Sequence, residues 1–202
     1  MLASGPDGSV EIEAKAVALA TGGFQASSEL RARHFGQWAD WVVVRGSPYC
    51  TGDGLEAALE AGAGTAGPFN RFYDHTLPAP PADDGPAQLR DRQDRLLVTL
   101  ADYNAACESG NSSSLSVPKT GGLEPVMTPP FYAIRLLIGM TFTYGGVRVN
   151  SRTEVVDTSG ASSRGLYAAG ADVGGLYTLG YTDGLSIGLA YGKIAGKGAA
   201  AL

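Results

Sequence analysis

The chain is 202 residues long, which suits one compact domain or a domain with a small second lobe. Apolar residues make up 44% of the sequence and charged residues 17%, the balance of an ordinary globular protein. The formal net charge of -5 argues against nucleic acid or an anionic membrane as the main partner. We expect a soluble, cytoplasmic protein, because the sequence has no apolar run long enough to span a membrane and no signal-peptide pattern at its start.

The first part of the chain predicts a strand and two short helices. Residues 9–15 alternate between apolar and charged side chains, as a half-exposed strand does, and lead into a short apolar run that ends in Gly-Gly. Such a run is typical of an internal parallel strand, and ligands of open α/β sheets bind beyond the carboxyl ends of these strands. Helices are expected over 27–33 and from Asp53 to Gly62, where Asp53 and Glu56 form a variant of the capping box.

The rest of the chain predicts a loop, a helix and then mostly strands. Residues 67–86 are rich in proline, glycine and aspartate and predict a loop, and apolar residues at helical spacing predict an amphipathic helix over about 87–107. Further along we expect a strand over 131–140, a hairpin over 147–157, a buried strand over 165–170 and a final helix over 183–202.

The final helix carries glycine at every fourth position, at Gly184, Gly188, Gly192 and Gly196. These glycines form one ridge without side chains, although each costs roughly 1 kcal/mol relative to alanine within a helix. One interpretation is close packing of the helix against a sheet. A compatible interpretation adds a flat ligand at the amino end of the helix, where unpaired N–H groups favour negative charge.

Few residues are suited to acid–base or metal chemistry. The two cysteines, Cys50 and Cys107, and the two histidines, His34 and His75, have no metal-ligand spacing, so we expect no metal site. Tyrosines are candidate proton donors, although buried aromatic packing is the commoner explanation for them, and arginines are candidate ligands for a carboxylate, although arginines on solvated faces are commoner. Among them we select Tyr144, Tyr181 and Arg135 as candidate catalytic residues.

Several glycine motifs occur in an order that resembles a known family. They are Ala18–Phe24, Thr51–Gly54, Gly145–Val147 and Gly165–Gly170, followed by the glycine-rich final helix. In this order they resemble the carboxyl-terminal half of the FAD-dependent fumarate reductase and succinate dehydrogenase flavoproteins. The segment 128–144 is most similar to the tricarballylate dehydrogenase and 3-ketosteroid dehydrogenase branches of that family.

The resemblance implies an α/β fold in which residues 1–66 and 126–202 form part of an FAD-binding domain. Residues 67–125 would then form a reduced cap lobe with one helix. FAD is the implied cofactor, and the motifs place the following residues near it: Thr21, Gly22, Gly23, Gly52, Asp53, Gly170, Asp172, Gly184, Leu185 and Ser186.

The sequence also departs from the family's pattern. We find no strand, Gly-x-Gly-x-x-Gly turn and helix in succession, the unit that holds the pyrophosphate in these proteins. Ala171 stands where the family usually has a glutamate that binds a cofactor sugar, and Asp172 follows it. The histidine and the arginine that fumarate reductases carry near Gly145 and before the last helix are missing as well.

These observations leave three functions open. The first is a flavin-linked oxidoreductase that acts on an activated carbon–carbon bond of a small organic acid or ketone, in which a partner chain carries the nucleotide-binding half. The second is a flavin-free enzyme on a degenerate flavoprotein scaffold that isomerises, dehydrates or cyclises a hydrophobic small molecule. The third is a binding protein without catalysis. Uncovered sheet edge and apolar surface predict a partner chain or a homodimer.

Overall fold

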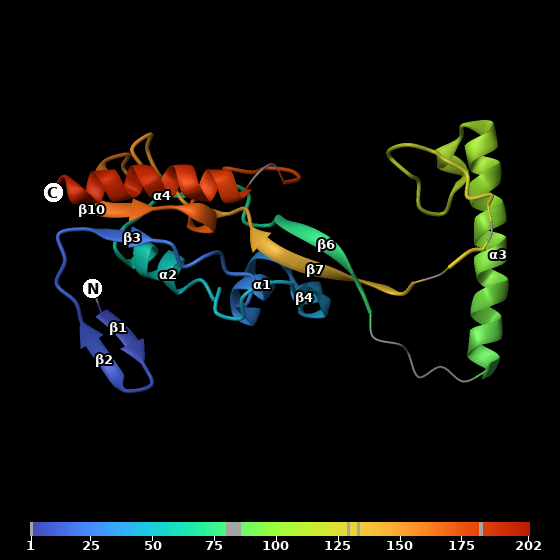
Figure 1. The fold of residues 1–202 in the computed structure, drawn as a ribbon, viewed down its shortest axis with the longest axis horizontal. Helices are drawn as coiled ribbons and strands as arrows, with labels where there is room; N and C mark the ends of the chain where they lie inside the picture. Colours follow the sequence, from blue (N-terminus) through green and yellow to red (C-terminus); the bar gives the residue numbers. More distant parts are fainter. Residues whose placement is uncertain (1, 80–85, 129, 133, 182–183) are drawn as a thin grey trace. The chain divides into compact units, whose positions relative to one another are not determined.

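The computed structural model describes residues 2–79, 86–128, 130–132, 134–181 and 184–202. The chain forms two compact units, of which the first comprises Met1–Leu77 and Leu137–Leu202 and the second Pro78–Leu136. Strands and helices alternate along the chain, so the fold class is α/β, as predicted (Figure 1). Among the described residues, no helix is both long and apolar enough to cross a membrane.

The sheet that positions the candidate site has the strand order β3-β10-β9. β3 (Val17–Leu19) runs parallel to β10 (Ser162–Ala168), with Leu19 opposite Ala168, and β9 (Glu154–Val156) is antiparallel to β10. The final helix α4 (Gly184–Ala200) packs over β10 and β3 and runs along β10 (Figure 1). Asp183, where we expected this helix to begin, lies outside the described residues.

Two further sheets are formed by strands β4 to β8. β4 (Val43–Val44) pairs in parallel with β7 (Leu136–Thr143), and β6 (Phe72–Pro78) flanks β7 on its other side. β5 (Thr65–Ala66) and β8 (Gly146–Val147) form a two-stranded antiparallel pair. The prediction of an unstructured loop over 67–86 was therefore wrong for β6, whose few apolar residues gave no strand-like alternation.

The amino-terminal hairpin differs from the predicted half-buried strand. β1 (Leu2–Gly5) pairs with β2 (Gly8–Glu11), and the residues of β2 are exposed on both faces. Val10 is 60% exposed and Ile12 is 40% exposed. The alternation correctly predicted a strand, but the buried face that it also predicted is absent. Within the described residues, these two strands pair only with each other.

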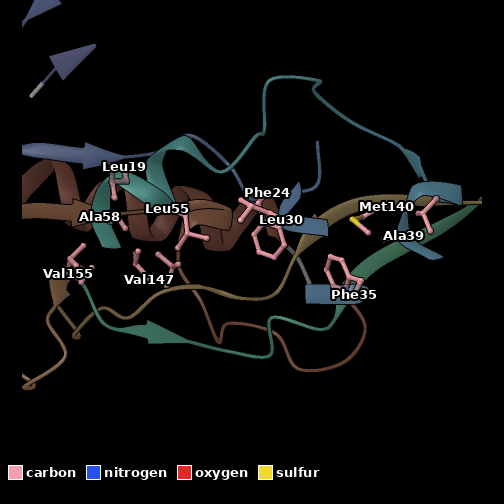
Figure 2. Close-up of a cluster of buried hydrophobic side chains, with 14 residues drawn as sticks. Leu19, Phe24, Leu30, Phe35, Ala39, Leu55, Ala58, Met140, Val147 and Val155 are labelled. Carbon is pink, nitrogen blue, oxygen red and sulfur yellow. The ribbon is translucent and has the colours of Figure 1, made fainter. Parts of the chain in front are cut away.

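Two short helices pack around the aromatic part of the core. α1 (Ser28–Phe35) begins at an N-cap serine, Ser27, whose hydroxyl accepts a hydrogen bond from the Leu30 N–H at 3.2 Å. The 3₁₀ turn η1 (Gln37–Trp41) follows it and packs against it. Figure 2 shows Phe24 and Leu30 side by side within the buried cluster.

Helix α2 (Asp53–Glu60) starts differently from the prediction. Its N-cap is Gly52, at φ 91°, and no side chain caps the helix, so the predicted capping box is wrong. The Asp53 carboxylate instead accepts a hydrogen bond from the Thr51 hydroxyl at 2.8 Å. Leu55 and Ala58 are buried, and Figure 2 shows them within the same cluster as Val147 and Val155.

The second unit is built on the long helix α3 (Pro86–Ser109), the helix predicted for this region. The 3₁₀ turn η2 (Ser112–Ser114) packs against this helix. Asn104 links helix α3 to the later segment at Val126, because its side-chain amide exchanges two hydrogen bonds with the backbone of Val126, at 2.9 and 3.1 Å. Most side chains described on α3 are exposed.

Candidate functional site

The carboxyl ends of β3 and β10 lie side by side, because the two strands are parallel and paired in register. β10 leads into a 3₁₀ turn, η3 (Gly170–Asp172). The Asp172 carboxylate joins the two strand ends: Oδ1 accepts a hydrogen bond from the Thr21 hydroxyl at 2.7 Å, and Oδ2 accepts one from the Gly22 N–H at 2.9 Å. The structure thus brings together three of the predicted site residues.

The Asp172 side chain is buried, with 3% of the residue exposed. Burial raises the pKa of this carboxyl group, while the hydrogen bonds from Thr21 and Gly22 act in the opposite direction. Its two oxygens are already hydrogen-bonded within the protein, so Asp172 fixes the geometry of the two turns.

The predicted glycines after β3 and before α2 are packed against other parts of the protein. A Cβ on Gly22 would lie 2.7 Å from the Cys50 sulfur, and one on Gly23 would collide with the Thr143 hydroxyl. A Cβ on Gly52 would lie 2.6 Å from Leu30 Cδ1. These glycines therefore let the turn after β3, the loop before α2 and the end of β7 approach one another closely.

A cavity of about 200 Å³ opens beside these strand ends. One side is formed by backbone and small residues at Gly170 and Ala171 and by the start of α4 at Gly184 and Leu185. A Cβ on Gly170, at φ 66°, would meet no atom within 4 Å, so the backbone is open to a ligand there. Leu185 is 85% exposed and Ser186 is exposed beside it.

Aromatic side chains also line the cavity, and two of them are the predicted Tyr144 and Tyr181. The Tyr144 hydroxyl donates a hydrogen bond to the Gly180 carbonyl at 2.6 Å, and burial is the main cause that raises its pKa. The Tyr181 ring lies against the start of α4, because a Cβ on Gly184 would be 2.6 Å from its Cε2. Tyr181 is 43% exposed.

Not every predicted residue lies in this cavity. Asp53 is exposed in the first turn of α2, hydrogen-bonded to Thr51. Arg135 belongs to the second unit, where its carbonyl accepts a hydrogen bond from the Ala79 N–H at 2.8 Å, and its role remains a prediction.

Sequence reasoning missed part of the aromatic side of the cavity. Phe142 lines the cavity, and Tyr73 stacks on Tyr181 with ring centroids 4.7 Å apart. Phe142 lies on strand β7 and Tyr144 directly follows the strand, and their spacing of two residues was the available signal for Phe142. Tyr73 had no such signal, because the segment that contains it did not look like a strand.

A Gly-x-Gly-x-x-Gly pattern does occur at Gly62, Gly64 and Gly67, but in the wrong structural context. It follows helix α2 and contains strand β5, whereas the nucleotide-binding turn joins a strand to a helix. A Cβ on Gly64 would lie 2.9 Å from the Asp157 carbonyl oxygen, so this glycine packs on protein backbone. The pattern is therefore not a pyrophosphate cradle.

Known proteins resemble this chain in sequence. The family model described as "FAD binding domain" matches residues 87–187, half of the chain. Vinyl phenol reductase of Lactiplantibacillus plantarum is 36% identical over 83 residues, which cover 41% of this chain and 17% of that protein. NADH:fumarate oxidoreductase of Klebsiella pneumoniae is 36% identical over 107 residues, which cover 52% of this chain and 11% of that protein.

Solved structures share the fold over almost the whole chain. The open conformation of a flavocytochrome c3 fumarate reductase superposes with a TM-score of 0.64 at 22% identity, covering 96% of this chain and 47% of that one. The 3-ketosteroid delta1-dehydrogenase from Sterolibacterium denitrificans superposes with a TM-score of 0.72 at 16% identity, covering 100% and 56%. The chain therefore spans less than two thirds of each of these relatives.

Proposed function

Because the chain belongs to the FAD binding domain family of fumarate reductase-like flavoproteins, we propose that it forms the part of a flavin-linked oxidoreductase that holds the flavin ring. The enzyme would act on an activated carbon–carbon bond of a small organic acid or ketone. The observation that supports this function best is the cavity where the ends of β3 and β10 meet the start of α4.

FAD is the cofactor of this family, and the residues at the cavity fit its ring system. The open backbone at Gly170 and the neighbouring Ala171 can lie against a flat ligand, and most of the wall is apolar. The first turn of α4, at Gly184, Leu185 and Ser186, has backbone N–H groups without partners within the helix, which favour negative charge on a reduced ring. When bound, the flavin would supply hydride transfer.

The protein's own contribution to the chemistry would be the transfer of a proton at the aromatic side of the cavity. We assign this role to Tyr181, because its ring lies beside the start of α4 and part of the side chain is exposed. Tyr144 would act as a positioning residue, since its hydroxyl holds the Gly180 carbonyl of the segment that leads to Tyr181. A raised pKa keeps the Tyr144 hydroxyl protonated at neutral pH, so this hydrogen bond persists.

Reoxidation of the flavin tests the proposed function. The chain, with any partner needed to retain FAD, would be reduced anaerobically and mixed with unsaturated acids and ketones while the flavin absorption is followed. We expect at least one such compound to reoxidise the flavin, and Tyr181→Phe to slow this step about 100-fold or more through the loss of acid catalysis. Tyr49→Phe is the matched control, because Tyr49 is 86% exposed outside the cavity. Reoxidation by none of the compounds would contradict the proposal.

We further propose that a polypeptide carrying the nucleotide-binding half covers the outer edge of β3 and the adjacent face of α4. Among the described residues no strand pairs with that edge, and Leu185 and Leu189 on α4 are 85% and 75% exposed. An unpaired strand beside an apolar helix face is suited to receive one more strand and helix. Light scattering of the purified chain tests whether this surface binds another chain. A stable monomer at micromolar concentration would count against the proposal.

A further inference from the structure

The aromatic side of the cavity is one connected cluster of rings from three segments of the chain. Tyr73 of β6 stacks on Tyr181 with centroids 4.7 Å apart and contacts Phe142 of β7 at 5.5 Å. Phe142 contacts Tyr144 at 5.7 Å and Tyr177 at 5.5 Å. A wall of this kind binds flat apolar molecules through ring stacking and edge contacts.

None of the described residues that line the cavity carries a charge. Arg71 lies outside it, and its Nη1 donates a hydrogen bond to the Thr178 carbonyl at 3.2 Å. Arg71 and Asp74 both line a separate hollow, so that hollow contains one positive and one negative charge. Tyr144 lines both this hollow and the cavity. Arg45 is exposed, and its Nη1 lies 3.5 Å from the Thr141 hydroxyl.

The charges around Tyr144 also disfavour an anion at this wall. Burial is the first cause that raises the pKa of its hydroxyl, and the negative charge of Asp74 raises it further, whereas Arg71 acts in the opposite direction. A carboxylate placed against this wall would lose its hydration without a bidentate arginine to replace it, which is costly in an apolar site.

We propose that this cavity selects a neutral, planar, conjugated molecule, such as an aryl-substituted enone, over a carboxylate of the same shape. In the enzyme, this molecule would lie against the aromatic wall, and the flavin ring would lie against the backbone at Gly170 and Ala171. Only the statement that this molecule is the substrate depends on the proposed function. The binding preference belongs to the cavity itself.

The test compares two ligands that differ in charge but hardly in shape. Benzalacetone and trans-cinnamate are both planar phenyl-substituted alkenes, one a neutral ketone and the other a carboxylate at neutral pH. Their dissociation constants would be measured by calorimetry on the purified chain without flavin. We expect benzalacetone to bind at least about tenfold more tightly, a difference of about 1.4 kcal/mol.

A charge placed on the aromatic wall should reverse this preference. Tyr181 is 43% exposed, so Tyr181→Arg should fold and should make cinnamate the tighter ligand, whereas Tyr49→Arg, outside the cavity, should change neither constant. The melting temperature of each variant confirms that it is folded.

Equal or tighter binding of cinnamate by the unmodified chain, or binding of neither ligand, would overturn the proposal. Preferential binding of benzalacetone that Tyr181→Arg leaves unchanged would overturn its assignment to this wall. If the chain prefers benzalacetone but none of the unsaturated compounds reoxidises its flavin, this inference stands and the proposed function is wrong. The two failures can therefore be distinguished.

Discussion

At the scale of single residues, the best-defined feature is the buried Asp172 carboxylate between the two strand ends. Its hydrogen bonds with Thr21 and Gly22 link segments that are 151 and 150 residues apart in the sequence. Because burial raises the pKa of this group, its charged form is less favourable in the folded protein than in the unfolded chain.

This shift predicts a pH dependence of stability. An acid with a raised pKa in the folded state stabilises the fold most at low pH, and the contribution is lost as the pH rises from its ordinary value of 3.8 through the raised value. The melting temperature of the unmodified chain should therefore fall across this range relative to that of Asp172→Asn. A constant difference between the two melting curves over this range would contradict the shift.

At the scale of elements, helix α4 shows which glycines are needed for packing. A Cβ on Gly198 would lie 2.7 Å from the Tyr167 ring, so this glycine lets the helix approach β10 closely. A Cβ on Gly188, Gly192 or Gly196 would meet no atom within 4 Å. The predicted glycine ridge therefore does not pack against the sheet, and its open side is left for other contacts.

Two alanine substitutions in α4 should have opposite effects on the isolated chain. Gly192→Ala should stabilise it by up to about 1 kcal/mol, because alanine is a better helix former and nothing obstructs its Cβ. Gly198→Ala should destabilise it by about 1–3 kcal/mol, because the Tyr167 ring must move. Urea unfolding of both variants measures these differences, and a loss of stability in Gly192→Ala would show that the ridge is covered.

The elements also show how far the sequence could predict the structure. Strong periodicity predicted helix α3, the repeated glycines marked helix α4, and the glycine motifs predicted the strand ends at the site. Strand β10 was predicted as well, but it is buried only at Tyr167 and Ala168. The capping box at Asp53 failed because Gly52 takes the N-cap position in a left-handed conformation, at φ 91°. Strand β6 and the contact between Tyr73 and Tyr181 depend on pairing between distant segments, which local patterns do not encode.

At the scale of the whole molecule, we propose that the chain forms one side of a flavoprotein site. The cavity, the open backbone at Gly170 and the start of α4 lie in the first unit. Solved relatives extend well beyond the matched part, since this chain covers 47% and 56% of two of them. Residues that would hold the dinucleotide end of FAD are therefore expected outside these 202 residues, and the ring end is the part that this chain can be tested for.

Binding of lumiflavin, the flavin ring without its ribityl phosphate and adenosine, tests the central claim most directly. The visible absorption and fluorescence of lumiflavin would be titrated with the purified chain and with Ala171→Trp, which fills the cavity from the side of Gly170. We predict saturable spectral changes with the unmodified chain and their loss in Ala171→Trp. Unchanged lumiflavin spectra, or equal binding by the two proteins, would contradict the assignment of the flavin ring to this cavity.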